Sequence, residues 1–317
     1  DELEKYVRQS ADNELARPTG DGIGKIEFNS NLAHLYAHFV RHTIDTSLEG
    51  LTIVYDGANG AASSVGPEIL SGLGAKVINI NVNPDGLNIN HHCGSTHIEG
   101  LQVAVQQHNA DLGIANDGDA DRCLLVDEKG QVLDGDQIML LCALKLKEEG
   151  KLKGDTIVGT VMSNIGFHKA AEELGMKTVS TAVGDRYVLE YMREHNLSVG
   201  GEQSGHVIFL DHNTTGDGML TAVQVAALMK EKKQPLSELA GIMTKYPQVL
   251  VNVRVATKTG WEDNDLIKAA IVTAEGELGD EGRVLVRASG TEPLIRVMAE
   301  GPNQEELQSL CQDIADI

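Results

Sequence analysis

The chain has 317 residues, of which 41% are hydrophobic and only 3% aromatic, and its formal charge at pH 7 is −21. This length suits two to three domains rather than one. The negative charge argues against a nucleic acid or an anionic membrane as a partner, because both are negatively charged themselves. No apolar run approaches the ~18 residues of a membrane-spanning helix. The four cysteines form no C-x-x-C pair and suggest reduced thiols in a cytoplasmic protein.

The first half of the chain reads as a tail followed by an α/β unit. Residues 1–30 contain turn signals such as RPTGDGIG and resemble the end of a preceding domain. The apolar pattern then predicts a helix over residues 30–44. Beyond it, short strands alternate with Gly-rich loops and helices, which is typical of an α/β sheet. The strands expected here are 51–56, 76–81, 110–115 and 123–127, with a helix at 65–74.

A second α/β unit follows a polar stretch, KEEGKLKGD, which predicts a domain boundary near Gly150. Its last predicted helix begins after Asp217, a residue type that caps helix N-termini well. The strands expected in this unit are 156–162, 177–183 and 206–210, and the helices are 166–175, 185–195 and 217–233.

The stretch TKYPQV reads as a second linker, and the last part of the chain begins within it, at residue 248. Strands at 248–255, 283–289 and 294–301, a helix at 265–278 and a closing helix predict a small α+β domain. We therefore predict two related α/β domains with mixed sheets, followed by a small α+β domain. The expected boundaries are 1–30 for the tail, 31–150 and 151–247 for the two α/β domains, and 248–317 for the last domain.

The stretch NDGDADRC places Asp117, Asp119 and Asp121 at alternate positions and follows them with Arg122. In an extended loop these three carboxylates project to one side, where they repel one another unless a cation lies among them. A solvated acidic turn is the simpler interpretation, but a turn between two buried strands seldom needs three acids. The pattern favours a hard-cation site, and Mg²⁺ suits it because three carboxylates leave coordination positions open for a phosphate oxygen.

Two other interpretations of this acid loop are weaker. An EF-hand would use the three aspartates and Glu128, but its sixth position should be Gly, and here it is Arg122. The flanks are also predicted strands, not helices. A phosphoryl-transfer nucleophile in a D-x-D pair would use Asp117 and Asp119, with Asp119 as the acid. The third acid, Asp121, favours three metal ligands instead.

The stretch RASGTEPLIR indicates a phosphate-binding turn. Its small residues offer hydroxyls and free backbone N–H groups, and the two arginines that bracket them can bind an anion bidentately. Taken alone, the stretch could equally be an ordinary Ser-Gly turn with two surface arginines. The candidate binding residues are Arg287, Ser289, Gly290, Thr291 and Arg296.

In GGEQSGHVIF, glycines flank Glu202, Gln203, Ser204 and His206 just before a predicted strand. Such a loop can bring a carboxylate and a hydroxyl close to sugar hydroxyls, because its own side chains obstruct little. On its own, an ordinary loop with a hydrogen-bonded histidine would explain the stretch as well.

In this order, the acid loop, the carboxylate-serine-histidine loop and the arginine-rich turn resemble the α-D-phosphohexomutases. The resemblance covers essentially the whole chain. PDGLNINHHCGST, GEQSGHVIF, TTGDG and RASGTEPLIRVMAEG are similar to a bacterial branch that acts on glucosamine phosphates. The phosphomannomutase/phosphoglucomutase branch, which is the alternative, usually has Met where Gln203 stands and lacks the C-G-S-T stretch.

The resemblance implies a role for each motif in a ping-pong phosphoryl exchange. In that reaction a phosphoserine donates to glucosamine 6-phosphate, the 1,6-bisphosphate reorients, and the other phosphate returns to the serine. Arg122 would lie beside the transferring phosphate, Glu202 and Ser204 would hold sugar hydroxyls, and His206 would lie close to the reacting groups. The implied Mg²⁺ ligands are Asp117, Asp119 and Asp121, and the non-reacting phosphate would meet Arg287, Ser289, Gly290, Thr291 and Arg296.

One departure from the family is large. Its phosphoserine stands in a T-A-S-H-N-P-like stretch that this sequence lacks, and Ser95 and Ser163 are only superficial substitutes. We therefore expect that a first domain is missing, and that this chain alone binds hexosamine phosphates without interconverting them. Its own N-terminal domain and a second copy of the chain are the expected protein partners. A non-catalytic metal- and phosphosugar-binding fragment is the alternative from another functional class.

Overall fold

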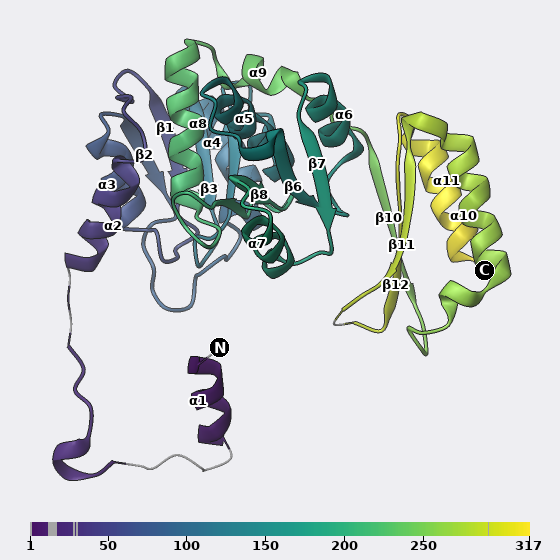
Figure 1. Cartoon of the computed structure of the whole chain (residues 1–317). Helices are drawn as coiled ribbons and strands as arrows, with labels where there is room; N and C mark the ends of the chain where they lie inside the picture. The colour runs from purple at the N-terminus through teal and green to yellow at the C-terminus, as the bar shows by residue number, and fades with distance from the viewer. Residues whose placement is uncertain (1, 12–17, 28, 30, 291) are drawn as a thin grey trace. The chain divides into compact units, whose positions relative to one another are not determined.

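The computed structural model describes residues 2–11, 18–27, 29, 31–290 and 292–317 (Figure 1). It divides into two compact units, residues 1–35 and 36–317. The first unit contains helix α1, Glu2–Ala11, and a short 3-10 turn at Gly20–Gly22. The turn signals of the predicted tail did not indicate α1, and tail residues 1, 12–17, 28 and 30 lie outside the described part. Helix α2, Asn31–Arg41, then lies where the apolar pattern predicted a helix.

The first sheet is mixed, as predicted, with strand order β2-β1-β3-β4-β5. Strands β2, β1 and β3 are parallel, and β4 and β5 are antiparallel to their neighbours. The strands are β1 (Thr52–Asp56), β2 (Lys76–Ile80), β3 (Leu112–Asn116), β4 (Cys123–Asp127) and β5 (Val132–Leu133), and the crossover helices are α3 (Val65–Gly72) and α4 (Glu99–His108). The sequence did not predict α4 or the two-residue β5.

Both faces of this sheet are covered, which explains why β3 is an uninterrupted buried strand. Leu112 and Ile114 point into the main core, whereas Ala115 points to the opposite face and joins a smaller core with Leu101 and Val105 of α4. The alternation follows from the period of two residues in a strand. Because β3 is packed on both faces, its position is fixed, and so is the start of the acid loop, which follows the last residue of β3.

The second sheet has the order β7-β6-β8-β9, with β9 antiparallel to β8 and the other neighbours parallel. The strands are β6 (Thr156–Thr160), β7 (Lys177–Thr181), β8 (Val199–Gly201) and β9 (Val207–Phe209), and the helices are α6 (Ile165–Glu173) and α7 (Asp185–Glu194). All were predicted except β8, in which two of three residues are glycine, a residue depleted in strands.

Helices α5 (Gly135–Glu148) and α8 (Gly218–Lys232) are labelled in Figure 1, and their buried side chains belong to one core that includes residues of both sheets. Helix α8 packs on β3 and β4, and α5 packs on α8 and on β6 and β8. Helix α5 precedes the boundary predicted near Gly150 but contacts the sheet beyond it. The domain boundaries predicted at residues 30, 150 and 247 remain predictions. Apolar as α8 is, no helix in the described residues is long and apolar enough to cross a membrane.

Asp217 caps α8, as the sequence predicted. Its carboxylate accepts hydrogen bonds from the backbone N–H of Leu220 at 2.9 Å and from the Tyr36 hydroxyl at 2.7 Å. We expect Asp217→Ala to lower the free energy of unfolding by about 1–2 kcal/mol for the cap alone, and further because the Tyr36 hydroxyl loses its acceptor. Urea denaturation checks this. The matched control Asn303→Ala removes an exposed cap, that of the last helix, and a loss at Asp217 no larger than at Asn303 would contradict the prediction.

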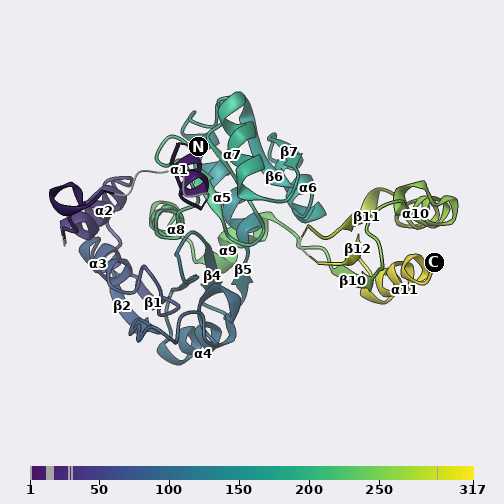
Figure 2. The same cartoon turned by 90° about the horizontal axis from the view of Figure 1, so that it is seen from below.

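The small C-terminal domain has an antiparallel sheet of order β10-β12-β11, with two helices on one side of it (Figure 2). Its elements are β10 (Gln248–Arg254), α10 (Asp265–Leu278), β11 (Arg283–Ala288), β12 (Leu294–Glu300) and α11 (Gln304–Ala315), as predicted within a few residues. Val249, Val297 and Ala299 face the helices and form a separate core with Leu307 and Cys311. The polar residues that alternate with these valines therefore lie on the other face of the sheet.

Candidate functional site

The acid loop begins where β3 ends, and its two ends are tied to the buried framework. Asn116, fully buried, accepts a hydrogen bond from the Tyr55 hydroxyl at 3.0 Å and donates to the carbonyl of Arg122 at 2.7 Å. The Gly-rich loop after β1 supports the loop's middle, because the Ala61 N–H donates to the Gly118 carbonyl at 2.8 Å. Only glycine fits at Gly60, since a Cβ there would lie 2.2 Å from the same carbonyl oxygen.

This anchoring brings the three predicted carboxylates together. Ligand oxygens of Asp117, Asp119 and Asp121 lie within 4.8 Å of one another. Burial, together with the charges of Asp121 and Asp119, raises the pKa of Asp117 to about 6, although the backbone N–H and charge of Arg122 oppose the shift. The close group of like charges is what the sequence pattern predicted, and it is electrostatically strained without a cation.

The polar atoms around the aspartates compensate this repulsion only in part. The Nε atom of Arg122 lies 3.7 Å from Asp117 and 3.8 Å from Asp121, and both this Nε and Asp121 Oδ1 are buried without a hydrogen-bond partner. A divalent cation among the three carboxylates would satisfy Asp121 Oδ1 and offset the repulsion. The residues present therefore fit a hard metal ion such as Mg²⁺, and their role as ligands stays a prediction.

The carboxylate-serine-histidine loop lies directly against the acid loop. Cys123 donates its N–H to the Gly205 carbonyl at 3.0 Å, and Arg122 pairs with His206 in an isolated antiparallel bridge. His206 is buried, with its Nε2 accepting from the Gly216 N–H at 3.2 Å and lying 3.6 Å from Asp121 Oδ2. The two motifs, about 80 residues apart in the sequence, thus form one site.

A hollow of about 400 Å³ opens beside this junction. Glu202 is partly buried, and its Oε1 accepts from the Gly184 N–H at 3.0 Å, which fixes the carboxylate. The hollow is lined by Arg122, Thr160, Met162, Val183, Glu202, Gln203 and Ser204. A larger hollow of about 530 Å³ between the end of α2, α5 and α8 contains none of the predicted site residues.

Sequence reasoning missed three lining residues of this hollow, Thr160, Met162 and Val183. Thr160 ends β6 and Met162 follows it, whereas Val183 comes just after β7. The carboxyl ends of parallel strands are where ligands bind in α/β sheets. That rule could have identified these residues once the strands had been placed.

The predicted phosphate turn lies in the C-terminal domain. Arg287 and Arg296 stand directly opposite each other on β11 and β12. Burial, and next the charge of Arg296, lowers the pKa of Arg287, and the buried Nε of Arg296 has no hydrogen-bond partner. Arg296 is paired through its Nη2 with Glu292 at 2.9 Å. Two arginines held face to face in this way favour an anion between them.

The turn differs from the prediction in one respect. The N–H of Ser289 is not free, because it donates to the Leu294 carbonyl at 2.8 Å, and the Ser289 hydroxyl accepts from the Glu292 N–H at 3.3 Å. Lys258, which the sequence did not single out, donates to the carbonyls of Ser289 and Gly290. Thr291 lies outside the described residues. Across the described chain, no hydrogen bond or ion pair joins Arg287 or Arg296 to the residues lining the hollow near Glu202.

Comparison with known families matches three consecutive domain models. Residues 32–130 match the phosphoglucomutase/phosphomannomutase alpha/beta/alpha domain II, residues 134–246 match domain III, and residues 250–317 match the C-terminal domain. The chain is 54% identical over 319 residues to a phosphoglucosamine mutase of Symbiobacterium thermophilum, and 52% over 320 residues to that of Desulforamulus reducens. Both alignments cover 100% of this chain, and 70% and 72% of those relatives.

Solved structures show the same fold at lower identity. A phosphoglucomutase/phosphomannomutase family protein of Burkholderia thailandensis superposes with a TM-score of 0.80 at 23% identity, over 99% of this chain and 68% of that one. An Aspergillus fumigatus N-acetylphosphoglucosamine mutase, solved with GlcNAc-6P and magnesium, superposes with a TM-score of 0.71 at 23% identity, over 88% of this chain and 68% of that one.

Proposed function

This chain belongs to the phosphoglucomutase/phosphomannomutase family, and from that premise we propose that it provides the metal-, sugar- and phosphate-binding parts of a phosphoglucosamine mutase. Such an enzyme is an isomerase that interconverts glucosamine 6-phosphate and glucosamine 1-phosphate. The observation that supports the proposal best is the direct contact between the acid loop and the loop of Glu202, with Arg122 at their junction. Relatives that match the whole chain at 50–54% identity are named phosphoglucosamine mutase.

Asp117, Asp119 and Asp121 would hold the Mg²⁺ ion. When bound, that ion supplies positive charge that stabilises a transferring phosphoryl group. Arg122 lines the hollow and would orient the same phosphate by charge-assisted hydrogen bonds. His206 is buried beside Asp121, so its place in the proposal is to support the junction of the two loops close to the reacting groups.

Glu202 and Ser204 would hold the sugar in the hollow. The Gly184 N–H already occupies one oxygen of the Glu202 carboxylate, which leaves the remaining lone pairs for sugar hydroxyls. In the C-terminal domain, Arg287 and Arg296 would bind the phosphate that does not react, with Ser289, Gly290 and Thr291 as the predicted remainder of that turn. Positioning at both ends of the substrate is most of what phosphoryl transfer requires of a protein.

The serine stretch expected of the family's nucleophile does not occur in these 317 residues. We therefore propose that this polypeptide by itself binds glucosamine phosphates and does not interconvert them. We also propose a cytoplasmic location, since all four cysteines are free and buried, as is usual for proteins of a reducing compartment. A second copy of the chain as a partner stays a prediction.

Calorimetry with Mg²⁺ tests the sugar assignment. We expect glucosamine 6-phosphate to bind more tightly than mannose 6-phosphate, and Glu202→Gln to weaken glucosamine 6-phosphate binding about fivefold, since an amide offers one acceptor where a carboxylate offers two, at ~1 kcal/mol per hydrogen bond. Inorganic phosphate should bind the variant and the parent equally. Glu172→Gln, an exposed substitution on α6, is the matched control. Equal or tighter binding of mannose 6-phosphate would instead favour a phosphomannomutase/phosphoglucomutase.

A further inference from the structure

The connection between the second sheet and the C-terminal domain is held by side chains, not by the linker alone. Asn164 caps α6, and its side chain also bonds both polar backbone atoms of Tyr246. Its Oδ1 accepts from the Tyr246 N–H at 3.0 Å, and its Nδ2 donates to the Tyr246 carbonyl at 3.0 Å. The backbone of Asn164 is anchored in turn, because its N–H donates to Asp136 at the start of α5 at 2.7 Å.

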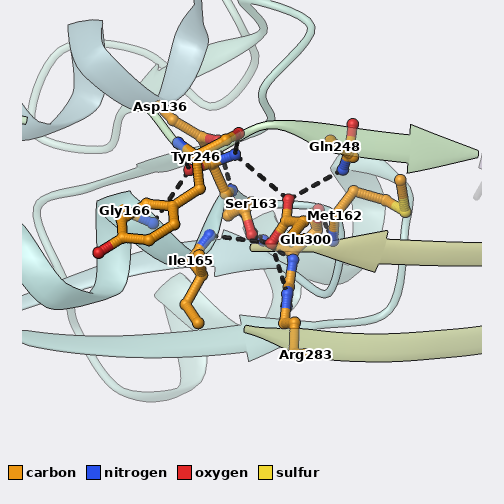
Figure 3. A network of polar contacts seen from close by, with 11 residues as sticks. Asp136, Met162, Ser163, Ile165, Gly166, Tyr246, Gln248, Arg283 and Glu300 are labelled. Atoms are coloured by element: carbon orange, nitrogen blue, oxygen red, sulfur yellow. Dashed lines mark hydrogen bonds and ion pairs between the residues drawn. The ribbon is translucent and has the colours of Figure 1, made fainter. Parts of the chain in front are cut away.

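Glu300, the last residue of β12, is fully buried at this connection and accepts four hydrogen bonds (Figure 3). Two donors belong to its own domain: Gln248 Nε2 at 2.9 Å and Arg283 Nε at 2.7 Å. The other two belong to the start of α6: Asn164 Nδ2 at 3.3 Å and the Ile165 N–H at 3.0 Å. We call this group the Glu300 clamp.

The clamp has the properties of a specific joint. A buried carboxylate is strongly unfavourable unless hydrogen bonds and a counter-charge surround it, and here the counter-charge is Arg283. The N-terminus of α6 adds a favourable helix dipole. Arg283 also bridges the two sides, since its Nη2 donates to the Ser163 carbonyl while its Nε binds Glu300. Each side of the joint therefore satisfies polar groups of the other.

The same two strands contain the clamp and the arginine pair. In the register of β11 and β12, Arg283 pairs with Glu300 and Arg287 pairs with Arg296. The pairs are four residues apart, so they lie on the same face of the sheet and about 14 Å from each other at ~3.4 Å per residue. An antiparallel ladder is stiff over this length. An angular change at the clamp would therefore move the arginines.

We propose that Glu300 is a positioning residue whose clamp on α6 sets the orientation of Arg287 and Arg296 relative to the domain that carries Glu202. A sugar phosphate that contacts both domains then binds two sites, the loop of Glu202 and the pair Arg287 and Arg296, whose relative orientation is already set. Inorganic phosphate contacts only Arg287 and Arg296, so its binding does not depend on the clamp. The part of this proposal that concerns ligands rests on the proposed function, whereas the orientation of the domain does not.

Energy transfer from Trp261 tests the orientation without any ligand. Trp261 is the single tryptophan and lies in the C-terminal domain, and the four native cysteines are buried. An acceptor dye attached through Glu173→Cys, at the exposed end of α6, therefore reports the distance between the two sides of the clamp. We expect a narrow distance distribution in the parent chain and a clearly broader one in Glu300→Gln.

Two further variants keep this test falsifiable. Arg283→Lys keeps the charge but cannot bind Glu300 and Ser163 at once, so it should broaden the distribution less than Glu300→Gln does. Glu148→Gln, the control, removes the carboxylate of an exposed ion pair with Lys232 and should change nothing. Circular dichroism confirms that each variant is folded. A distribution in folded Glu300→Gln or Arg283→Lys that equals that of the parent overturns the proposal.

Calorimetry supplies the functional readout. In Glu300→Gln, glucosamine 6-phosphate should bind about tenfold more weakly, because two partial sites that are no longer held in register have a lower effective concentration for each other. Binding of inorganic phosphate should not change, which a general loss of structure would not produce. If the parent itself bound the sugar phosphate no more tightly than phosphate, the proposed function would fail, and the energy-transfer result would still decide whether Glu300 is a clamp.

Discussion

Asp119→Asn should weaken Mg²⁺ binding by at least about tenfold, because it removes one of three charged oxygen ligands, and even altered partners of metal ligands cost about 10–100-fold in affinity. Asp119 is the exposed member of the three aspartates, so the substitution should leave the fold intact. Titration calorimetry with Mg²⁺ measures the change. Asp280→Asn, an exposed aspartate in the C-terminal domain, is the control. Unchanged Mg²⁺ affinity in Asp119→Asn would refute the metal assignment.

The same site predicts a pH dependence. In the metal-free protein, burial first and the neighbouring aspartates next raise the pKa of Asp117 to about 6, from 3.8. Protonated Asp117 therefore stabilises the metal-free fold at acid pH, and this contribution is lost as the pH rises through 6. Mg²⁺ binds the ionised form and competes with the proton. We expect Mg²⁺ to raise the melting temperature at pH 7.5 and to have little effect at pH 5. An equal rise at both pH values would be inconsistent with Asp117 as a ligand.

Arg287→Gln should cost about 1.5–3 kcal/mol of glucosamine 6-phosphate affinity, because it removes a charged, bidentate hydrogen-bond partner of the phosphate. The loss should extend to inorganic phosphate, unlike the effect of Glu300→Gln. The variant should be no less stable than the parent, since Arg287 and Arg296 are like charges directly opposite on neighbouring strands. Calorimetry and thermal melting measure both quantities.

Arg193→Gln, an exposed substitution on α7, controls for the loss of one positive charge from a protein of net charge −21. It should leave phosphate affinity unchanged. Phosphate-induced NMR shifts should be centred on the described residues between 287 and 296. Shifts that mapped to another part of the molecule would contradict the assignment of this turn.

Most strands and helices followed from the sequence because their apolar periods are local. Strands β1, β3 and β4 and helix α8 are buried, and their alternating or continuous apolar residues mark them clearly. Strand β8 could not be found in this way. Its residues Val199–Gly201 include two glycines, and it is a strand only because β6 and β9 supply its hydrogen bonds.

In the candidate site, too, the sequence predicted what depends on neighbouring residues and not the contacts between residues far apart in the chain. The grouping of the three aspartates follows from their spacing, and the arginine pair follows from the turn between two predicted strands. The contact of Arg122 with His206 joins loops of two different sheets, and no local pattern contains it. Glu300 looked like an ordinary strand end, because its four hydrogen-bond donors come from residues 52, 17, 136 and 135 positions away.

A crystal of this chain soaked with Mn²⁺ and glucosamine 6-phosphate would test the proposed site most directly. Mn²⁺ accepts the same oxygen ligands as Mg²⁺ and is visible by its anomalous scattering. We predict one strong anomalous peak among Asp117, Asp119 and Asp121, with sugar density against Glu202 and phosphate density at Arg287 and Arg296. Metal bound elsewhere, or a sugar phosphate that touches neither Glu202 nor the arginine pair, would contradict the proposed site.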